Sequence, residues 1–94
     1  MFTSVEINMK DNNYAAVIQE LTPIFRDVFD DDQLMIDAQT SAKDVDGWDS
    51  LLHIRLIFSI EKNLALRFSA SEVSRLENVG EMAELVVKKR IDSR

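Results

Sequence analysis

A chain of 94 residues is long enough for one small domain with a single modest core and too short for two. Its 46% hydrophobic and 30% charged residues are typical of a globular protein, and its two glycines and one proline favour an all-α fold. The formal net charge of −6 argues against nucleic-acid and anionic-membrane partners, and the lack of cysteine excludes disulfides. We expect a cytoplasmic protein, because neither a membrane span nor a signal peptide is recognisable.

The N-terminal part divides into two segments. Residues 1–13 are polar and weakly patterned, so we expect a flexible N-terminal extension there and a domain over residues 14–94. From Tyr14 onward, apolar residues recur at three- and four-residue spacing, which predicts an amphipathic helix. Pro23 lies inside this pattern, so the helix should kink there or restart with Thr22 as its cap. The apolar face consists of Val17, Ile18, Leu21, Phe25 and Val28.

An acidic stretch follows this helix. Residues 27–49 contain eight acids and one base, which gives the stretch a net charge of −7. Calcium is the obvious ligand to consider, but frames counted from Asp30 and from Asp44 both lack the glycine and the final glutamate of an EF-hand loop. We therefore expect no metal site, and we interpret the acids as a solvated or partner-facing surface of a long loop.

The five residues Gly47-Trp48-Asp49-Ser50-Leu51 lead from this loop into a helix. No glycine or proline occurs in the ten residues after Ser50, so Ser50 is expected to open the helix. Two interpretations stay open for the serine. Asp49 and Ser50 could simply cap the helix, because their oxygens accept its first N–H groups. Alternatively, these N–H groups could receive a phosphate esterified to Ser50.

The helix from Ser50 to about Lys62 is apolar on more than one side. At 100° per residue, one side forms a core face made of His53, Leu56, Ile57, Ile60 and Leu64. Leu51, Ile54 and Phe58 stand at i, i+3 and i+7 and form a strip that runs down the helix from Ser50, with Arg55 and Lys62 on the same side. This strip is either core, covered by the long loop or the next helix, or a docking surface for a partner.

The remaining sequence predicts two more helices. Ser69 and Glu72 have the spacing of a capping box, so a short helix should run to about Leu76. A last helix should begin near Asn78 and end at the basic run 88–90, where cations suit the helix dipole. The predicted architecture is a four-helix bundle with a long first loop and a short third helix. Its core should contain Val17, Leu21, Phe25, Val28, Ile57, Ile60, Leu64, Phe68, Met82, Leu85 and Val86.

Catalytic residues are not recognisable. His53 is the only histidine and follows Ser50 by one helical turn, so it is either a packed side chain or a contact for a phosphate there. A catalytic triad needs a base with an orienting partner, and no such set is visible. Nor does the sequence place two carboxylates across a cleft. We expect no enzymatic activity.

The segment Gly47–Leu51, the apolar helix after it, and the later segments Phe68–Glu72 and Asn78–Met82 together resemble the acyl carrier protein family. The resemblance runs from about Tyr14 to Lys89, and Trp48 and Asp49 before the serine resemble the free-standing members. It implies that Ser50 carries 4′-phosphopantetheine covalently, with Asp49 and Leu51 as recognition flanks. A phosphopantetheinyl transferase would attach this group, using coenzyme A and magnesium.

The resemblance also implies acyl-loading and acyl-accepting partners, such as a ligase, a ketosynthase or an acyltransferase, for a monomeric carrier. The implied partner-binding residues are Trp48, Leu51, Ile54, Arg55, Phe58, Glu61 and Glu72. The implied acyl pocket contains Ile54, Ile57, Ile60, Phe68 and Val73. The second helix departs from the family pattern, because His53, Arg55 and Lys62 stand where the family usually has acids. We therefore expect a dedicated set of partners.

Two other functions stay open at this stage. An aminoacyl or peptidyl carrier protein would use the same serine and the same bundle, and its loading enzyme would distinguish it. An unmodified helical adaptor would keep the fold without the arm, and its binding would survive Ser50→Ala. The sequence also leaves open whether the cargo belongs to fatty acid, polyketide, lipid or polysaccharide metabolism.

Overall fold

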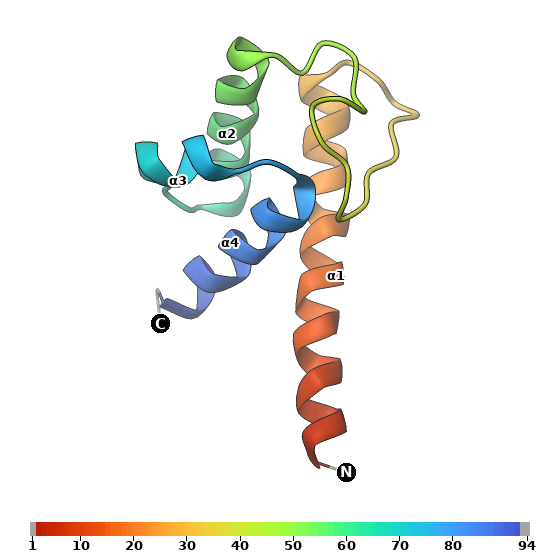
Figure 1. The fold of residues 1–94 in the computed structure, drawn as a ribbon, viewed down its shortest axis with the longest axis vertical. Helices are drawn as coiled ribbons and strands as arrows, with labels where there is room; N and C mark the ends of the chain where they lie inside the picture. Colours follow the sequence, from red (N-terminus) through yellow and green to blue (C-terminus); the bar gives the residue numbers. More distant parts are fainter. Residues whose placement is uncertain (1, 93–94) are drawn as a thin grey trace.

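Four helices make up the fold: α1 (Phe2–Val28), α2 (Ser50–Leu64), α3 (Ala70–Arg75) and α4 (Val79–Asp92). The structure is a computed structural model that describes the backbone of residues 2–92 and the side chains of residues 14–91. α2 and α4 both pack against the long α1, and the short α3 lies across from α1 beside α2 and α4 (Figure 1). Over residues 2–92 the backbone forms no strand. The predicted all-α bundle, with its long first loop and short third helix, is confirmed.

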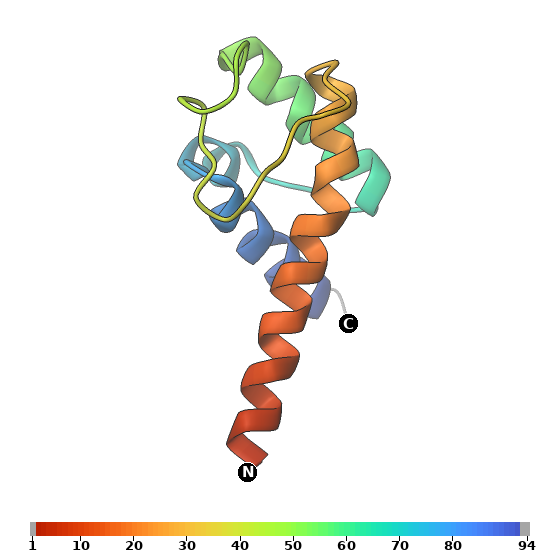
Figure 2. The ribbon, with the colours of Figure 1, turned by 90° about the vertical axis from the view of Figure 1, so that its right-hand side faces the viewer.

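α1 differs from the prediction at its start and at its proline. The helix begins at Phe2 rather than Tyr14, because residues 2–13 contain neither glycine nor proline to end it. The assignment of residues 1–13 to an extension outside the domain stays a prediction. Pro23 lies within one unbroken helix (Figure 2), so the predicted restart at Thr22 is wrong. The Thr22 hydroxyl instead donates a hydrogen bond of 2.9 Å to the Ile18 carbonyl.

The core lies where α1, α2 and α4 meet. Seven of the predicted core residues are buried, whereas Val28, Leu64, Phe68 and Leu85 are only partly buried. The largest fully buried side chains come from all three helices, and each contributes about 1.5–3 kcal/mol by leaving water. They are Phe25, Leu21, Leu56, Ile60, Met82, Val79 and Val86. The long loop adds Val45 and Trp48, which lie in irregular backbone, where helical periodicity gives no signal.

The long loop, residues 29–49, is tied to the start of α4. The Val79 N–H donates to the Thr40 carbonyl at 2.9 Å, and the Gly80 N–H donates to the Ala38 carbonyl at 2.8 Å. Gly80 allows this approach, since a Cβ there would lie 2.8 Å from the Ala38 oxygen. These contacts fix the middle of the loop before it reaches Ser50.

Several loop aspartates have a local structural role. Asp31 and Asp37 each accept a hydrogen bond from the backbone N–H two residues on, at 3.0 and 2.9 Å, and Asp44 accepts the N–H of Ser41 at 3.0 Å. Such bonds stabilise turns, which is why Asp is frequent in them. The acids are exposed, as expected, but these three also shape the loop instead of serving only as surface charge.

Candidate functional site

Ser50 is the first residue of α2, and Asp49 is its N-cap. The Asp49 Oδ1 atom accepts the N–H of Leu52 at 2.9 Å, and the Asp49 carbonyl accepts the N–H of His53 at 2.8 Å. Within the described part of the chain, the N–H groups of Ser50 and Leu51 have no acceptor. Asp49 therefore caps the helix and leaves the Ser50 side chain free. The Ser50 side chain is left exposed beside two available donors at the positive end of the helix dipole.

A tight turn before Asp49 separates the buried part of this segment from its exposed part. Gly47 has a φ of +86°, a conformation that a residue with a Cβ rarely adopts. The N–H of Trp48 bonds the Val45 carbonyl at 3.2 Å, and the N–H of Asp49 bonds the Gly47 carbonyl at 2.9 Å. As a result, Trp48 is buried whereas Asp49 and Ser50 are exposed.

Trp48 anchors this turn in the core. Its ring lies 5.4 Å from that of Phe25 in an edge-on arrangement and 5.8 Å from that of Phe29, both on the α1 side of the core. Such aromatic contacts add to the free energy gained by burial. Only 8% of Trp48 is exposed, which leaves little of its side chain for a partner, and its role as a partner contact stays a prediction. Its bulk holds the segment that precedes Ser50.

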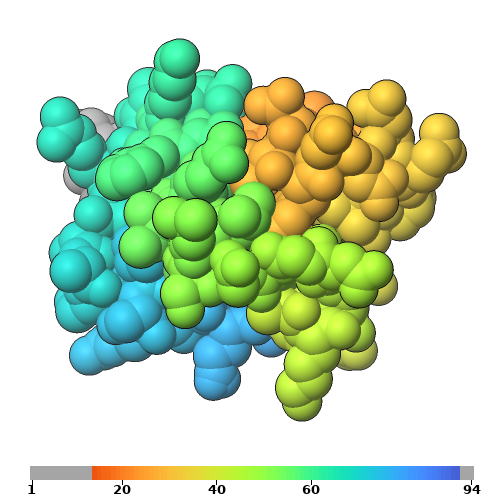
Figure 3. All heavy atoms as spheres, turned by 90° about the horizontal axis from the view of Figure 1, so that it is seen from above, coloured from red at the N-terminus to blue at the C-terminus, as the bar shows by residue number. Residues whose placement is uncertain are grey.

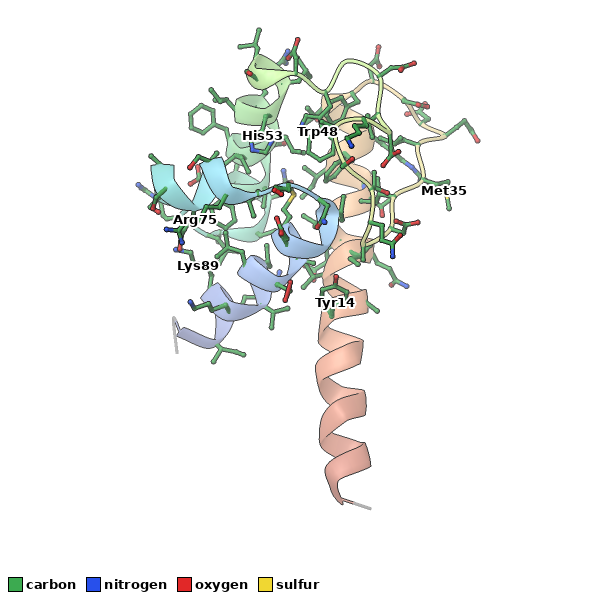
Figure 4. All side chains as sticks on the ribbon, viewed as in Figure 1. Tyr14, Met35, Trp48, His53, Arg75 and Lys89 are labelled. Atoms are coloured by element: carbon green, nitrogen blue, oxygen red, sulfur yellow. The ribbon has the colours of Figure 1, made fainter. Side chains whose placement is uncertain are left out.

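His53 connects this turn to α3. The Trp48 Nε1–H donates to the His53 Nδ1 atom at 3.1 Å, and the His53 Nε2 atom lies 3.3 Å from the Val73 carbonyl oxygen (Figure 4). Because the indole can only donate, Nδ1 must accept, so the imidazole proton sits on Nε2 and points to Val73. Both ring nitrogens are thus engaged, which favours the packed side chain over the alternative of a contact with a phosphate on Ser50. The signal for this pair was present in the sequence, since the only tryptophan and the only histidine flank the serine.

An open hollow of about 480 Å³ lies beside Ser50, between the start of α2 and α3. Its lining is partly polar and includes Ser50, His53, Ile54, Val73, Ser74 and Glu77. Of the five residues of the expected acyl pocket, only Ile54 and Val73 line this hollow. Ile57 and Ile60 are packed in the core at 3% and 0% exposure, and Phe68 is partly buried against it. The structure does not bring all five around one cavity.

The strip on α2 is exposed. Leu51 is 66% exposed, Ile54 48% and Phe58 65%, which excludes the alternative that the strip is core. Arg55 is exposed as well. Seen from the end where α2 begins, this helix (green) covers the centre of the molecular surface, between the loop and α3 (Figure 3). A partner approaching this end would meet Ser50 and the strip together.

The two acids of the expected partner surface have internal roles. The Glu61 Oε2 atom accepts the N–H of Phe68 at 2.8 Å, which fixes the turn after α2. The Glu72 Oε1 atom accepts the N–H of Ser69 at 2.8 Å, completing the predicted capping box, and pairs with Lys89 at 2.8 Å. The hydrogen bond from Lys89 lowers the pKa of the Glu72 carboxyl. These contacts give both carboxylates a role within the fold, and their assignment to partner binding stays a prediction.

Comparisons with known proteins agree with this geometry. Residues 19–86 match the family described as "Phosphopantetheine attachment site". The chain is similar to the holo acyl carrier protein from Geobacter metallireducens, known from a solution NMR structure, with 47% identity over 82% of this chain and 88% of that one and a TM-score of 0.77. It shares its fold with an acyl carrier protein from Thermotoga maritima, with 24% identity over 87% of this chain and 95% of that one and a TM-score of 0.76. A search of curated proteins found no match.

The chain therefore belongs to the acyl carrier protein family. It is a carrier rather than an enzyme, and its cofactor is the 4′-phosphopantetheine that domains of this family carry covalently. None of the helices over residues 2–92 is long and apolar enough to cross a membrane. Among the described side chains, no group of three or more histidines and acids is arranged to hold a metal ion.

Proposed function

We propose that this protein carries acyl groups as thioesters on a phosphopantetheine arm at Ser50 and delivers them to partner enzymes. The observation that carries the proposal is the setting of the Ser50 side chain. It is exposed at the first residue of α2, next to two backbone N–H groups without an acceptor and beside an open hollow. This setting fits a serine that must reach a transferase and then hold a phosphodiester.

Each neighbour of Ser50 has a part in this proposal. Asp49 caps the helix without covering the serine, so the N–H groups of Ser50 and Leu51 stay available for phosphate oxygens. Leu51 is exposed and, with Asp49, offers the transferase a recognition flank. Trp48 anchors the turn in the core, so Ser50 is held in place. A transferase loses less conformational entropy when it binds a fixed serine than when it binds a mobile one.

The arm supplies a terminal thiol for the thioester, and the protein confines that thiol near its surface. Tethering raises the effective concentration of the cargo at a docked active site. Ile54 and Val73 are the pocket residues that cargo would meet first, because they line the hollow. Ile57, Ile60 and Phe68 complete the proposed pocket, and cargo would contact them only by displacing the side chains packed around them.

The proposed partners are a phosphopantetheinyl transferase and enzymes that load or accept acyl groups, such as a ligase, a ketosynthase or an acyltransferase. We assign the protein to the cytoplasm as a monomer, in a specialised pathway of polyketide, lipid or polysaccharide chemistry. The support for a specialised pathway is the exposed face of α2, where Arg55 and Lys62 replace the acids usual in the family.

The test is intact mass after incubation with a broad-specificity phosphopantetheinyl transferase, coenzyme A and magnesium. Folded wild-type protein, shown beforehand to be unmodified, should gain one phosphopantetheine group. Ser50→Ala should gain none, whereas Ser74→Ala, a matched change at an exposed serine beside the same hollow, should behave as wild type. If folded wild type gains nothing, the carrier proposal fails and the unmodified adaptor becomes the better account.

A further inference from the structure

Charge is divided unevenly around Ser50. The loop before it, over residues 27–49, has a net charge of −7. Residues 50–76, which form α2, the connection and α3, contain four bases and two acids and have a net charge of +2. A chain with a net charge of −6 thus has an excess of basic residues in the segment that follows its proposed attachment site. The four bases are Arg55, Lys62, Arg67 and Arg75, all of them exposed.

Two of these bases lie on the same face of α2 as the exposed apolar strip. At 100° per residue, Leu51, Ile54, Arg55, Phe58 and Lys62 fall within a sector of roughly 100°. These five residues form the α2 face. Its apolar members are about half to two-thirds exposed. They follow Ser50 directly down the helix, so a protein that reaches the serine also meets this face.

The cations of the α2 face have no ion-pair partner among the described side chains. By contrast, Lys89 on α4 pairs with Glu72 at 2.8 Å, and Arg90 pairs with Glu20 at 2.7 Å. The nearest acid along α2, Glu61, is instead bonded to the backbone of Phe68. A chain with 17 acids therefore leaves Arg55 and Lys62 available for another molecule.

We propose that the enzymes that act on the arm of Ser50 bind the α2 face in an apolar pocket whose rim is acidic. This inference rests on the proposed carrier function. Phe58 supplies an aromatic side chain of the kind that anchors protein interfaces. A basic rim would place like charges opposite Arg55 and Lys62, whereas carboxylates there would be complementary. A second copy is a poor occupant, because a two-fold contact through this face would bring the same cations together.

The test uses photo-crosslinking from the centre of the face. Phe58→p-benzoylphenylalanine keeps an aromatic anchor, and Ile91→p-benzoylphenylalanine on α4 is the control, since Ile91 is also apolar and 62% exposed. Both variants, carrying the arm as checked by intact mass, are irradiated in a lysate of the organism that encodes the chain. Unlabelled competitors are wild type, R55E/K62E and K43E/K88E. The two double variants have the same net charge, so they separate the α2 face from overall charge.

The proposal predicts crosslinks from position 58 and not from position 91. Wild type and K43E/K88E should compete for them equally, and R55E/K62E should need at least a tenfold higher concentration. The crosslinked partner peptides should lie beside an excess of Asp and Glu. R55Q/K62Q replaces the charge-reversed variant if circular dichroism shows that the latter is unfolded.

Several results would overturn the inference. One is that R55E/K62E competes as well as wild type or better, and another is that the crosslinked site on the partner is basic. The inference also fails if crosslinks form only between copies of this chain, or if a protein that carries the arm gives no crosslink. Failure of the carrier proposal would look different, because the bait would then fail to acquire the arm before any irradiation.

Discussion

Gly80→Ala tests whether the loop and α4 are as closely packed as the structure shows. A Cβ at Gly80 would lie 2.5 Å from the Tyr14 hydroxyl oxygen and 2.8 Å from the Ala38 carbonyl oxygen. The tyrosine can move, but the carbonyl is held by its 2.8 Å hydrogen bond from the Gly80 N–H. Overpacking of this kind costs about 1–3 kcal/mol, and the backbone contact places this case near the upper value.

Helix propensity acts in the opposite direction, because alanine is favoured over glycine by about 1 kcal/mol. The expected net loss in the free energy of unfolding is therefore about 2 kcal/mol. For a domain of this size, such a loss lowers Tm by about 8–16 °C. Thermal and urea unfolding followed by circular dichroism measure both quantities.

A double-mutant cycle separates the two contacts. Tyr14→Phe removes the oxygen that would lie 2.5 Å from the new Cβ, so Gly80→Ala should cost about 0.5–1 kcal/mol less in that background. The contact with Ala38 remains, so the cost should not vanish. An increase in Tm for the single Gly80→Ala variant would refute the reasoning, since it would mean that the loop yields at no cost.

Three further predictions concern the helices. Leu56→Ala should lower the free energy of unfolding by about 2–5 kcal/mol because Leu56 is fully buried, whereas Leu51→Ala should lower it by no more than about 0.5 kcal/mol. Equal losses for the two variants in urea unfolding would contradict the burial pattern. Asp49→Ala removes the N-cap acceptor and should cost about 1 kcal/mol, with faster hydrogen exchange in the first turn of α2; unchanged exchange would argue against the cap. The hydrogen bond from Arg90 lowers the pKa of the Glu20 carboxyl below its usual 4.5. The Glu20–Arg90 pair therefore contributes its full stabilisation of the fold above pH 4.5, and this contribution is lost as the pH falls through the lowered pKa. Both groups are more than a third exposed, so Glu20→Gln should remove at most about 1 kcal/mol at neutral pH and flatten the acid dependence of unfolding; an unchanged acid slope would contradict this.

Local chemistry made much of this fold predictable. The capping box of Ser69 and Glu72 depends on residues three apart, and the structure contains it as predicted. The exposed strip of Leu51, Ile54 and Phe58 followed from helical geometry once Ser50 was taken as the first residue. In each case the interaction lies within one element, so sequence spacing carries the information.

Contacts between distant segments were not predictable in the same way. The bonds from α4 to Ala38 and Thr40 join positions about forty residues apart, and no spacing rule indicates them. The burial of Trp48 also depends on where α1 places Phe25 and Phe29. Helical spacing therefore predicts Ser50 at the start of the helix but not the burial of Trp48.

The position of Trp48 gives the protein an intrinsic optical probe. It is the only tryptophan, so all indole fluorescence comes from one site. That indole donates a hydrogen bond to His53, and both residues line the hollow beside Ser50. Cargo that enters the hollow would change the polarity around the ring and shift its emission. Arm attachment, loading and release could then be followed in real time on the unlabelled protein.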